Sequence, residues 1–437
     1  MLTRRGFLGA AGLAGLAATA PTVPPRSGDA AQDPLPPLRR PPGSPEAVAR
    51  DEDYWRRVAA YYRVDGGYTN LEAGYFGMMA APVLAQYHRH IDRVNRESSY
   101  YARRGYDADL ATARTRMAAF LGAKPGEVAF TRGATEALQR LIIQYRPVAA
   151  GDAVIYADLD YGSMQLAMNA LARQRGARVV TFDLPEPATR ENVLAAYDRV
   201  LASTPGARLL LVTHLSNKTG LIVPVAEIVA MARERGVGVI VDAAHSFGQC
   251  DLKLGDLGAD FVGLNLHKWL GAPVGAGVMY IKEERLGDMD AMLGDDGPAD
   301  RIDSRIHTGT TNFATFLTVP AALDFNDAVG PPHKAARLKY LRDRWVGTLR
   351  GTAGIDILAP DQPGMSAAIT SFRLGGRTGR EENQAVVREL LDRFRIFTVW
   401  RTGVAGGDCV RVTPALYNTP QDVDRLVEAL EELAARS

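Results

Sequence analysis

The sequence predicts an α/β protein built on a mainly parallel sheet. Between Val128 and Tyr280, seven short apolar runs alternate with helical patterns, as expected for parallel strands joined by crossover helices. The chain has 437 residues, which exceeds the usual size of one domain. After Tyr280 the alternation lapses into a mixed α+β pattern. We therefore expect a large domain with a seven-stranded sheet and a smaller α+β C-terminal domain.

The expected elements follow from the periodicity of apolar residues. The seven apolar runs cover 128–130, 153–156, 179–182, 209–212, 239–241, 261–264 and 277–280. Before them, residues 54–106 have a helical, aromatic pattern with an extended break at 71–77. After them we expect helices at 336–349 and 420–435, and strands near 371–372 and 410–412.

The N-terminus is similar to a twin-arginine export signal. Arg4-Arg5 is followed by Phe7-Leu8 and a Gly/Ala-rich apolar run that is too short to span a bilayer in the mature protein. A small-residue cleavage pattern ends at Ala20, and Ala30 or Ala31 is an alternative end. The signal predicts export through the twin-arginine machinery and a periplasmic mature protein.

These observations predict five segments. They are a signal peptide (1–31), a Pro-rich linker (32–47), an N-terminal arm (48–75), a large domain (76–330) and a small C-terminal domain (331–437).

Composition disfavours several classes of partner. The 51 basic and 50 acidic residues leave a net charge of +1, so no general field favours nucleic acid or an anionic membrane. No later segment is long and apolar enough to cross a bilayer. The two cysteines, Cys250 and Cys409, have no metal-ligand spacing, and we expect no metal site.

An acid and a lysine stand at the ends of successive apolar runs. Asp242 ends the run 239–241, and Lys268 follows the run 261–264. Such strand ends are where open α/β sheets build their sites. An aspartate can hold a pyridine nitrogen protonated, and a lysine can form an imine with an aldehyde. Together the pair predicts a site for pyridoxal 5′-phosphate (PLP).

Other strand ends carry residues that suit this cofactor. The turn with Gly133, Ala134 and Thr135 opens a helix, so its amides could hold a phosphate, although an ordinary helix cap is the alternative. Tyr161 could stack on the cofactor ring or belong to the core. Asn217 could donate to the phenolic oxygen or simply form a turn.

These stretches, in this order, resemble the class V aminotransferases, a family of fold-type I PLP-dependent transferases. The resemblance runs from about Tyr68 to the C-terminus, and 242–245 and 267–268 are its most specific parts. It implies that Lys268 forms the aldimine with PLP and that Asp242 pairs with the pyridine nitrogen.

The resemblance also implies the remaining cofactor contacts. Asn217 and His245 are expected at the phenolic oxygen, and Tyr161 over the ring. Asn265 stands where many relatives carry a phosphate-binding Ser. The other cofactor-binding residues expected from the match are Gly133, Ala134, Thr135 and His267.

Two further matches concern the partner subunit and the substrate. The turn 309–312 resembles one that reaches the phosphate of the neighbouring subunit, which implies a homodimer and a cofactor contact by Thr310. Arg411 matches the arginine that grips the substrate α-carboxylate, a role suited to its bidentate fork. A surface ion pair is the alternative for Arg411.

The expected activity is that of an aminotransferase acting on an amino acid or peptide-like amine. The residues most resemble isopenicillin N epimerase-like proteins, so an epimerase or a lyase is the alternative. Desulfuration is disfavoured because Gly406 stands about where one group of desulfurases carries its cysteine. A non-catalytic binding protein is less expected, since Asp242, Lys268 and Arg411 are all kept.

Overall fold

The computed structural model describes residues 37–295, 297–298, 300–306 and 309–436. Contacts divide the chain into Met1–Pro37 and Leu38–Ser437, and the features below belong to the second unit. The expected signal peptide (1–31) and residues 32–36 of the expected linker lie outside the described residues. Within the described part, no helix is long and apolar enough to cross a membrane.

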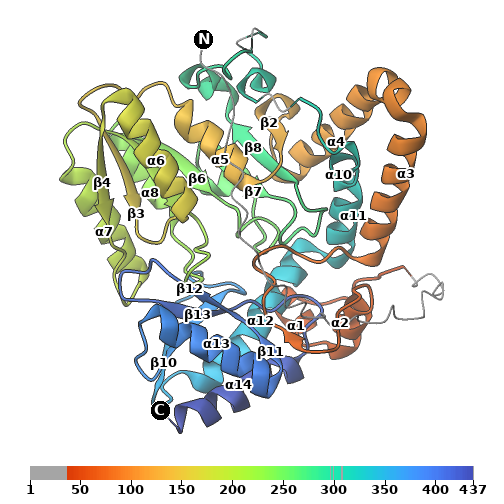
Figure 1. Cartoon of the computed structure of the whole chain (residues 1–437), viewed down its shortest axis with the longest axis vertical. Helices are drawn as coiled ribbons and strands as arrows, with labels where there is room; N and C mark the ends of the chain where they lie inside the picture. The colour runs from red at the N-terminus through yellow and green to blue at the C-terminus, as the bar shows by residue number, and fades with distance from the viewer. Residues whose placement is uncertain (1–36, 296, 299, 307–308, 437) are drawn as a thin grey trace, which may run out of the picture. The chain divides into compact units, whose positions relative to one another are not determined.

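The large sheet has seven strands in the order β2-β8-β7-β6-β5-β3-β4 (Figure 1). Only β8 runs antiparallel to its neighbours, so the predicted mainly parallel sheet is confirmed. The strands are β2 (Val128–Thr131), β3 (Ala153–Ala157), β4 (Arg178–Phe182), β5 (Ala207–Thr213), β6 (Gly238–Asp242), β7 (Phe261–Asn265) and β8 (Gly277–Ile281).

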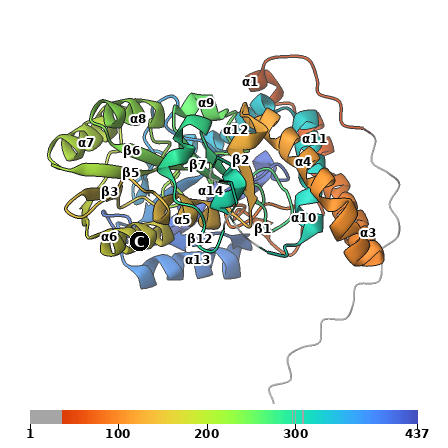
Figure 2. The ribbon, with the colours of Figure 1, turned by 90° about the horizontal axis from the view of Figure 1, so that it is seen from above.

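Helices cover both faces of this sheet, which explains why its inner strands are mainly apolar, whereas the edge strand β4 is largely exposed. Successive residues of a strand point to opposite faces. Leu210 and Val212 belong to one core cluster, whereas Leu209 and Leu211 belong to another. In Figure 2, α7 (Arg190–Ala202) and α8 (Val225–Glu234) lie on one side of the strands. Helices α5 (Ala134–Ile143) and α6 (Gly162–Arg175) lie on the other.

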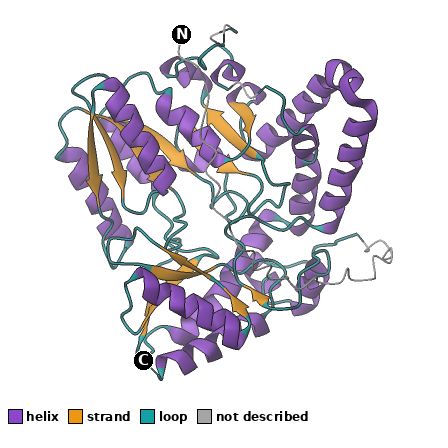
Figure 3. Ribbon diagram, viewed as in Figure 1, coloured by secondary structure: helices purple, strands orange, loops and turns teal. Residues whose placement is uncertain are grey.

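A group of helices packs beside the β2 end of the sheet (Figure 3). Its members contact one another and are α3 (Ala81–Arg104), α4 (Tyr106–Leu121), α10 (Phe313–Leu317) and α11 (Val319–Val329). The shorter elements nearby are α9 (Leu254–Leu257) and the 3₁₀ helices Pro125–Glu127, Glu283–Asp288 and Ile302–Arg305.

The C-terminal region forms a second, antiparallel sheet in the order β12-β13-β10-β9. Its strands are β9 (Ile355–Ile357), β10 (Thr370–Leu374), β12 (Val399–Arg401) and β13 (Cys409–Val412), with helices α12 (Pro331–Leu349), α13 (Arg380–Phe394) and α14 (Pro420–Ala434). Strands β9 and β12 and helix α13 were not expected from the sequence. Helix α12 starts five residues earlier than the predicted 336, because prolines are tolerated in a first helical turn.

The N-terminal segment packs against this C-terminal region. Helix α1 (Pro45–Val48) begins inside the range expected to be linker, because Ser44 caps its first turn. After α2 (Glu52–Ala59), strand β1 (Thr69–Asn70) pairs in parallel with β11 (Ile396–Phe397). This pairing carries residues 71–77 toward the edge of the large sheet.

Candidate active site

The carboxyl ends of the central strands meet at one edge of the large sheet. Thr213 is opposite Asp242, and Asp242 is opposite Gly263. Because β8 is antiparallel, its first residue, Gly277, lies at this same edge opposite Asn265. A cavity of about 570 Å³ opens there, a size typical of cofactor sites. It is lined by every predicted site residue except Thr310.

The turn between β2 and α5 forms one end of the cavity. Thr131 Oγ1 donates to the Gly133 carbonyl at 2.9 Å, which shapes the turn. A Cβ atom at Gly277 would lie 2.5 Å from Gly133 Cα, so only glycine allows this close approach. Helix α5 starts at Ala134, and the amides of a first helical turn lack intrahelical acceptors. The turn is therefore suited to bind a phosphate.

Asn265 and His267 are fixed beside this turn. Asn265 Oδ1 accepts a hydrogen bond of 2.7 Å from the Ala134 amide, so this amide is already paired. The next amides belong to Thr135 and Glu136, and the exposed Thr135 side chain lines the cavity. His267 donates from Nδ1 to the Ala276 carbonyl at 2.8 Å, and burial lowers its pKa.

Lys268 and His245 form the central contact of the site. Lys268 Nζ lies 2.8 Å from His245 Nε2. On the other side of the imidazole, Trp269 Nε1 donates to His245 Nδ1 at 3.4 Å. An indole N–H only donates, so Nδ1 must accept and the neutral ring carries its proton on Nε2. That proton points at Lys268 Nζ, which must then accept it as an unprotonated amine.

Electrostatics favour the same protonation states. Burial, followed by the charge on Arg411, lowers the pKa of Lys268 to about 8, and the charge on Asp242 opposes this shift. Burial, followed by the charge on Lys268, holds the pKa of His245 well below its usual range. A neutral imidazole and a neutral amine are therefore compatible in slightly alkaline solution.

Asp242 and Asn217 are buried polar groups that suit a ring-shaped ligand. Asp242 Oδ1 accepts from the Ala244 amide at 2.9 Å. Burial raises the Asp242 pKa and the charge on Lys268 lowers it, so a cationic ring nitrogen would stabilise the ionised form. Asn217 Oδ1, a hydrogen-bond acceptor, is buried without a partner among the described residues. Tyr161 lines the cavity and is 40% exposed.

The expected carboxylate clamp, Arg411, is a buried cation within this cavity. Its Nη1 donates to the Asn217 carbonyl at 2.8 Å, and its Nη2 contacts both oxygens of Glu72. The alternative of a surface ion pair is wrong, because Arg411 is only 1% exposed. The residue does form an ion pair, but that pair is buried and lies at the cavity wall.

Sequence reasoning missed a second guanidinium, that of Arg401. Arg401 also lines the cavity, and burial followed by the charge on Arg411 lowers its pKa to about 10. The signal that could have revealed it is its place at the end of β12, directly before a glycine-containing loop. Because strand β12 was not predicted from the sequence, the position of Arg401 in the site could not be predicted either.

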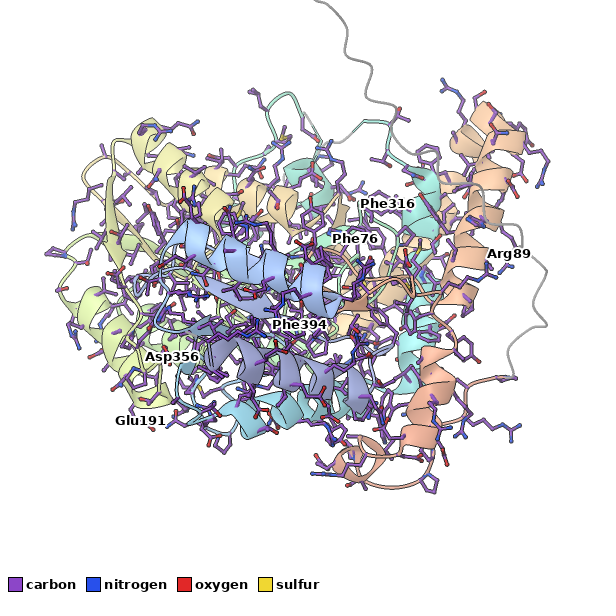
Figure 4. The ribbon with its side chains drawn as sticks, turned by 60° about the horizontal axis from the view of Figure 1, so that its bottom comes forward. Phe76, Arg89, Glu191, Phe316, Asp356 and Phe394 are labelled. Atoms are coloured by element: carbon purple, nitrogen blue, oxygen red, sulfur yellow. The ribbon has the colours of Figure 1, made fainter. Side chains whose placement is uncertain are left out.

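The mouth of the cavity is apolar and aromatic. Tyr75, Phe76 and Val274 line it, and each is at least half exposed. Figure 4 labels Phe76. Thr310, by contrast, is exposed and lies outside this cavity, so its contact with a neighbouring subunit stays a prediction. No described group of three or more His, Cys, Asp or Glu side chains could hold a metal ion.

Comparison with known proteins identifies the family. The aminotransferase class-V profile matches residues 80–426, and the chain belongs to this family. It is 32% identical over 405 residues to the isopenicillin N epimerase of Amycolatopsis lactamdurans, covering 87% of this chain and 98% of that protein. The isopenicillin N epimerase of Streptomyces clavuligerus is 30% identical over 400 residues, with the same coverage. A probable cysteine desulfurase of Chlamydia muridarum is 28% identical, covering 73% of this chain and 82% of that protein.

Solved structures share the fold. The cysteine desulfurase CsdA from Escherichia coli has a TM-score of 0.72 at 22% identity, covering 87% of this chain and 98% of that one. A C-DES mutant with glycine linked covalently to its PLP cofactor has a TM-score of 0.74 at 20% identity, covering 84% and 97%. The fold-type I architecture and the PLP cofactor predicted from the sequence are thus confirmed. The chain is a PLP-dependent enzyme of the class V fold.

The lowered pKa of Lys268 predicts how the apoprotein takes up PLP. The amine attacks the aldehyde only when unprotonated, and its pKa lies at about 8 rather than 10.5. The rate of PLP uptake should therefore rise about tenfold per pH unit below this pKa and level off above it. Stopped-flow absorbance measures this rate, with Lys268→Ala as the control that lacks the lysine-dependent phase. A rate that keeps rising to pH values near 10.5 would contradict the assignment.

The contact between Trp269 and His245 predicts a single tautomer. In the wild-type protein, ¹⁵N NMR of ring-labelled histidine should show His245 protonated at Nε2. Trp269→Phe removes the donor to Nδ1, so both tautomers should become populated. The matched control is Trp345→Phe, because the Trp345 indole N–H has no hydrogen-bond partner among the described residues. Protonation at Nδ1 in the wild type would overturn the hydrogen-bond assignment.

Proposed function

We propose that the protein is a PLP-dependent aminotransferase acting on an amino acid or peptide-like amine. The observation that carries this proposal is the buried amine of Lys268, which lies 2.8 Å from His245 Nε2 in a cavity also lined by Asp242 and by the guanidinium groups of Arg401 and Arg411. These groups provide a nucleophile, a partner for a ring nitrogen and an anchor for a carboxylate.

Each residue has a distinct task in the proposed reaction. PLP, when bound, accepts the electrons released when a bond to the substrate Cα breaks. Asp242 supplies the negative charge that keeps the pyridine nitrogen protonated. The Lys268 amine would remove the proton from the substrate Cα as a general base and would deliver it again as a general acid. Arg401 and Arg411 line the cavity where they can orient a carboxylate.

Epimerisation is the second candidate, and the relatives favour it. Two proteins at 30–32% identity are named isopenicillin N epimerase. An epimerase would use the same Lys268 and Asp242 but return the proton to the other face of Cα. A PLP-dependent lyase would share this machinery as well, so the products distinguish the three reactions.

Cysteine desulfuration has little support from the two cysteines of the chain. Cys409 is buried in β13, and burial raises its thiol pKa to about 11. Burial likewise raises the pKa of Cys250 to about 12. A side chain at Gly406 would begin 2.7 Å from the Glu186 carboxylate, so a cysteine there would require the Glu186 side chain to move.

We also propose export by the twin-arginine route to the periplasm, and assembly as a homodimer. Residues 3–8 and the apolar run after them support export. The exposed Thr310, placed away from the cavity of its own chain, supports a contact in which it serves a neighbouring site. In a homodimer this arrangement would complete two equivalent sites.

The proposed activity is tested by absorption spectroscopy of the PLP-loaded protein. An absorbance band that depends on Lys268 should appear in the wild type and be lost in Lys268→Ala. Lys339→Ala is the matched control, since Lys339 pairs with Asp343 on the surface of α12 and should not affect the band.

The same protein is then incubated with L- and D-amino acids in heavy water. Recovery of pyridoxamine phosphate and a keto acid would support transamination. Deuterium at Cα with inverted configuration, without pyridoxamine phosphate, would favour epimerisation. If no amine changes the band, the catalytic proposal fails and a PLP-binding module remains.

Export is tested separately with Arg4→Lys and Arg5→Lys together. Paired lysines keep the charge but should abolish twin-arginine transport, so the protein should move from the periplasmic to the cytoplasmic fraction. Unchanged periplasmic accumulation would rule out the twin-arginine route.

A further inference from the structure

A buried carboxylate, Glu72, pairs with two of the cations that line the active site without itself lining the cavity. Its side chain is only 4% exposed. The carboxylate accepts hydrogen bonds of 2.5 and 2.8 Å from Arg411 Nη2 and of 3.0 Å from Thr413 Oγ1. Arg401 Nη2 lies 3.5 Å from the same group. Glu72 therefore pairs with both cations that line this part of the cavity.

The fold holds Glu72 firmly in this position. Thr413 donates from its amide to the Leu71 carbonyl at 2.8 Å, and Glu72 bridges to Thr413 in parallel register. Asn70 Oδ1 accepts from the Glu72 amide at 2.9 Å. A Cβ at Gly74 would lie 2.4 Å from Arg411 Nη2, so glycine is needed to leave room for the guanidinium. Glu72 and Gly74 thus confine Arg411 within one short segment.

The charges in this cluster do not cancel. Two guanidinium groups and one carboxylate give +2 − 1 = +1 when all three are ionised. The cluster is not fully paired, because the Nε atoms of Arg401 and Arg411 are buried without a hydrogen-bond partner in the described part of the chain. Burial strengthens interactions between charges, so one further anionic group is favoured and a second is not.

We infer that Glu72 is a specificity-determining residue that restricts this end of the site to one carboxylate. The preferred substrates are amines that place a single carboxylate beside Arg401 and Arg411. Amines that would place two carboxylates there are expected to bind less well. The inference rests on the proposed function for the substrate class, but the charge balance can be tested without any turnover. Glu72 also keeps Arg411 in place, which makes Glu72→Gln the appropriate variant because the amide keeps an acceptor.

The test measures binding of propanoate and succinate to the PLP-loaded protein by isothermal titration calorimetry. Neither ligand has an amino group, so binding does not depend on the reaction. In wild type, succinate should bind no more tightly than propanoate. In Glu72→Gln, both should bind more tightly, and the gain for succinate should exceed that for propanoate by about tenfold, since one unit of repulsion is removed.

Glu186→Gln is the matched control. Glu186 makes a similar pair of hydrogen bonds, of 2.7 and 3.0 Å, to Arg373, and neither residue lines the cavity. This variant should leave both dissociation constants unchanged. If Glu72→Gln leaves the succinate-to-propanoate ratio unchanged or weakens both ligands, the inference is wrong and Glu72 only orients Arg411.

The wild-type protein provides a measurement that does not depend on folding of the variant. Clear preference for succinate over propanoate in the wild type would by itself overturn the inference. Failure of the proposed function is distinguishable, because it would appear as a PLP band that no amine alters while the carboxylate preference persists.

Discussion

The site depends on burial of the Lys268 amine, which lowers its pKa to about 8. A buried ammonium is costly unless it is paired, and the two nearby guanidinium groups raise that cost. The amine also contacts His245, whose protonated Nε2 faces it because Trp269 donates to the other ring nitrogen. Asp242 acts in the opposite sense and limits the shift. The charges of Asp242 and Arg411 therefore both affect the protonation of Lys268.

The second sheet is needed because it supplies Arg401 and Arg411, two of the arginines that line the cavity. Asp242, Asn265 and the β2–α5 turn come from strand ends of the large sheet, whereas Arg401 and Arg411 come from β12 and β13. Glu72 belongs to a third segment, the chain that follows β1, and the pairing of β1 with β11 positions this segment. A substrate must thus contact both sheets, which couples recognition of its carboxylate to placement of its amine.

Patterns of residues close together in the sequence predicted the strands of the large sheet and the residues that follow them. The seven strands were visible because strands covered on both faces are continuously apolar. Asp242 and Lys268 were visible because an acid and a lysine follow successive apolar runs, and this pair suits PLP. Strand β12 and helix α13 were missed, because Val399–Arg401 is short and only partly buried and α13 carries many charged residues. Arg401 was not predicted as a site residue because strand β12, which positions it, was not predicted.

The sequence by itself predicted the sheet from its periodicity, and the cofactor from Asp242 and Lys268 beside apolar runs together with the resemblance to a known family. Only the tertiary structure decided how those residues are charged and paired. The contact of His245 with Lys268 spans 23 residues and that of Glu72 with Arg411 spans 339. No local pattern encodes such pairs, because they form only when separate segments share a buried volume. In that volume, desolvation decides which groups carry charge.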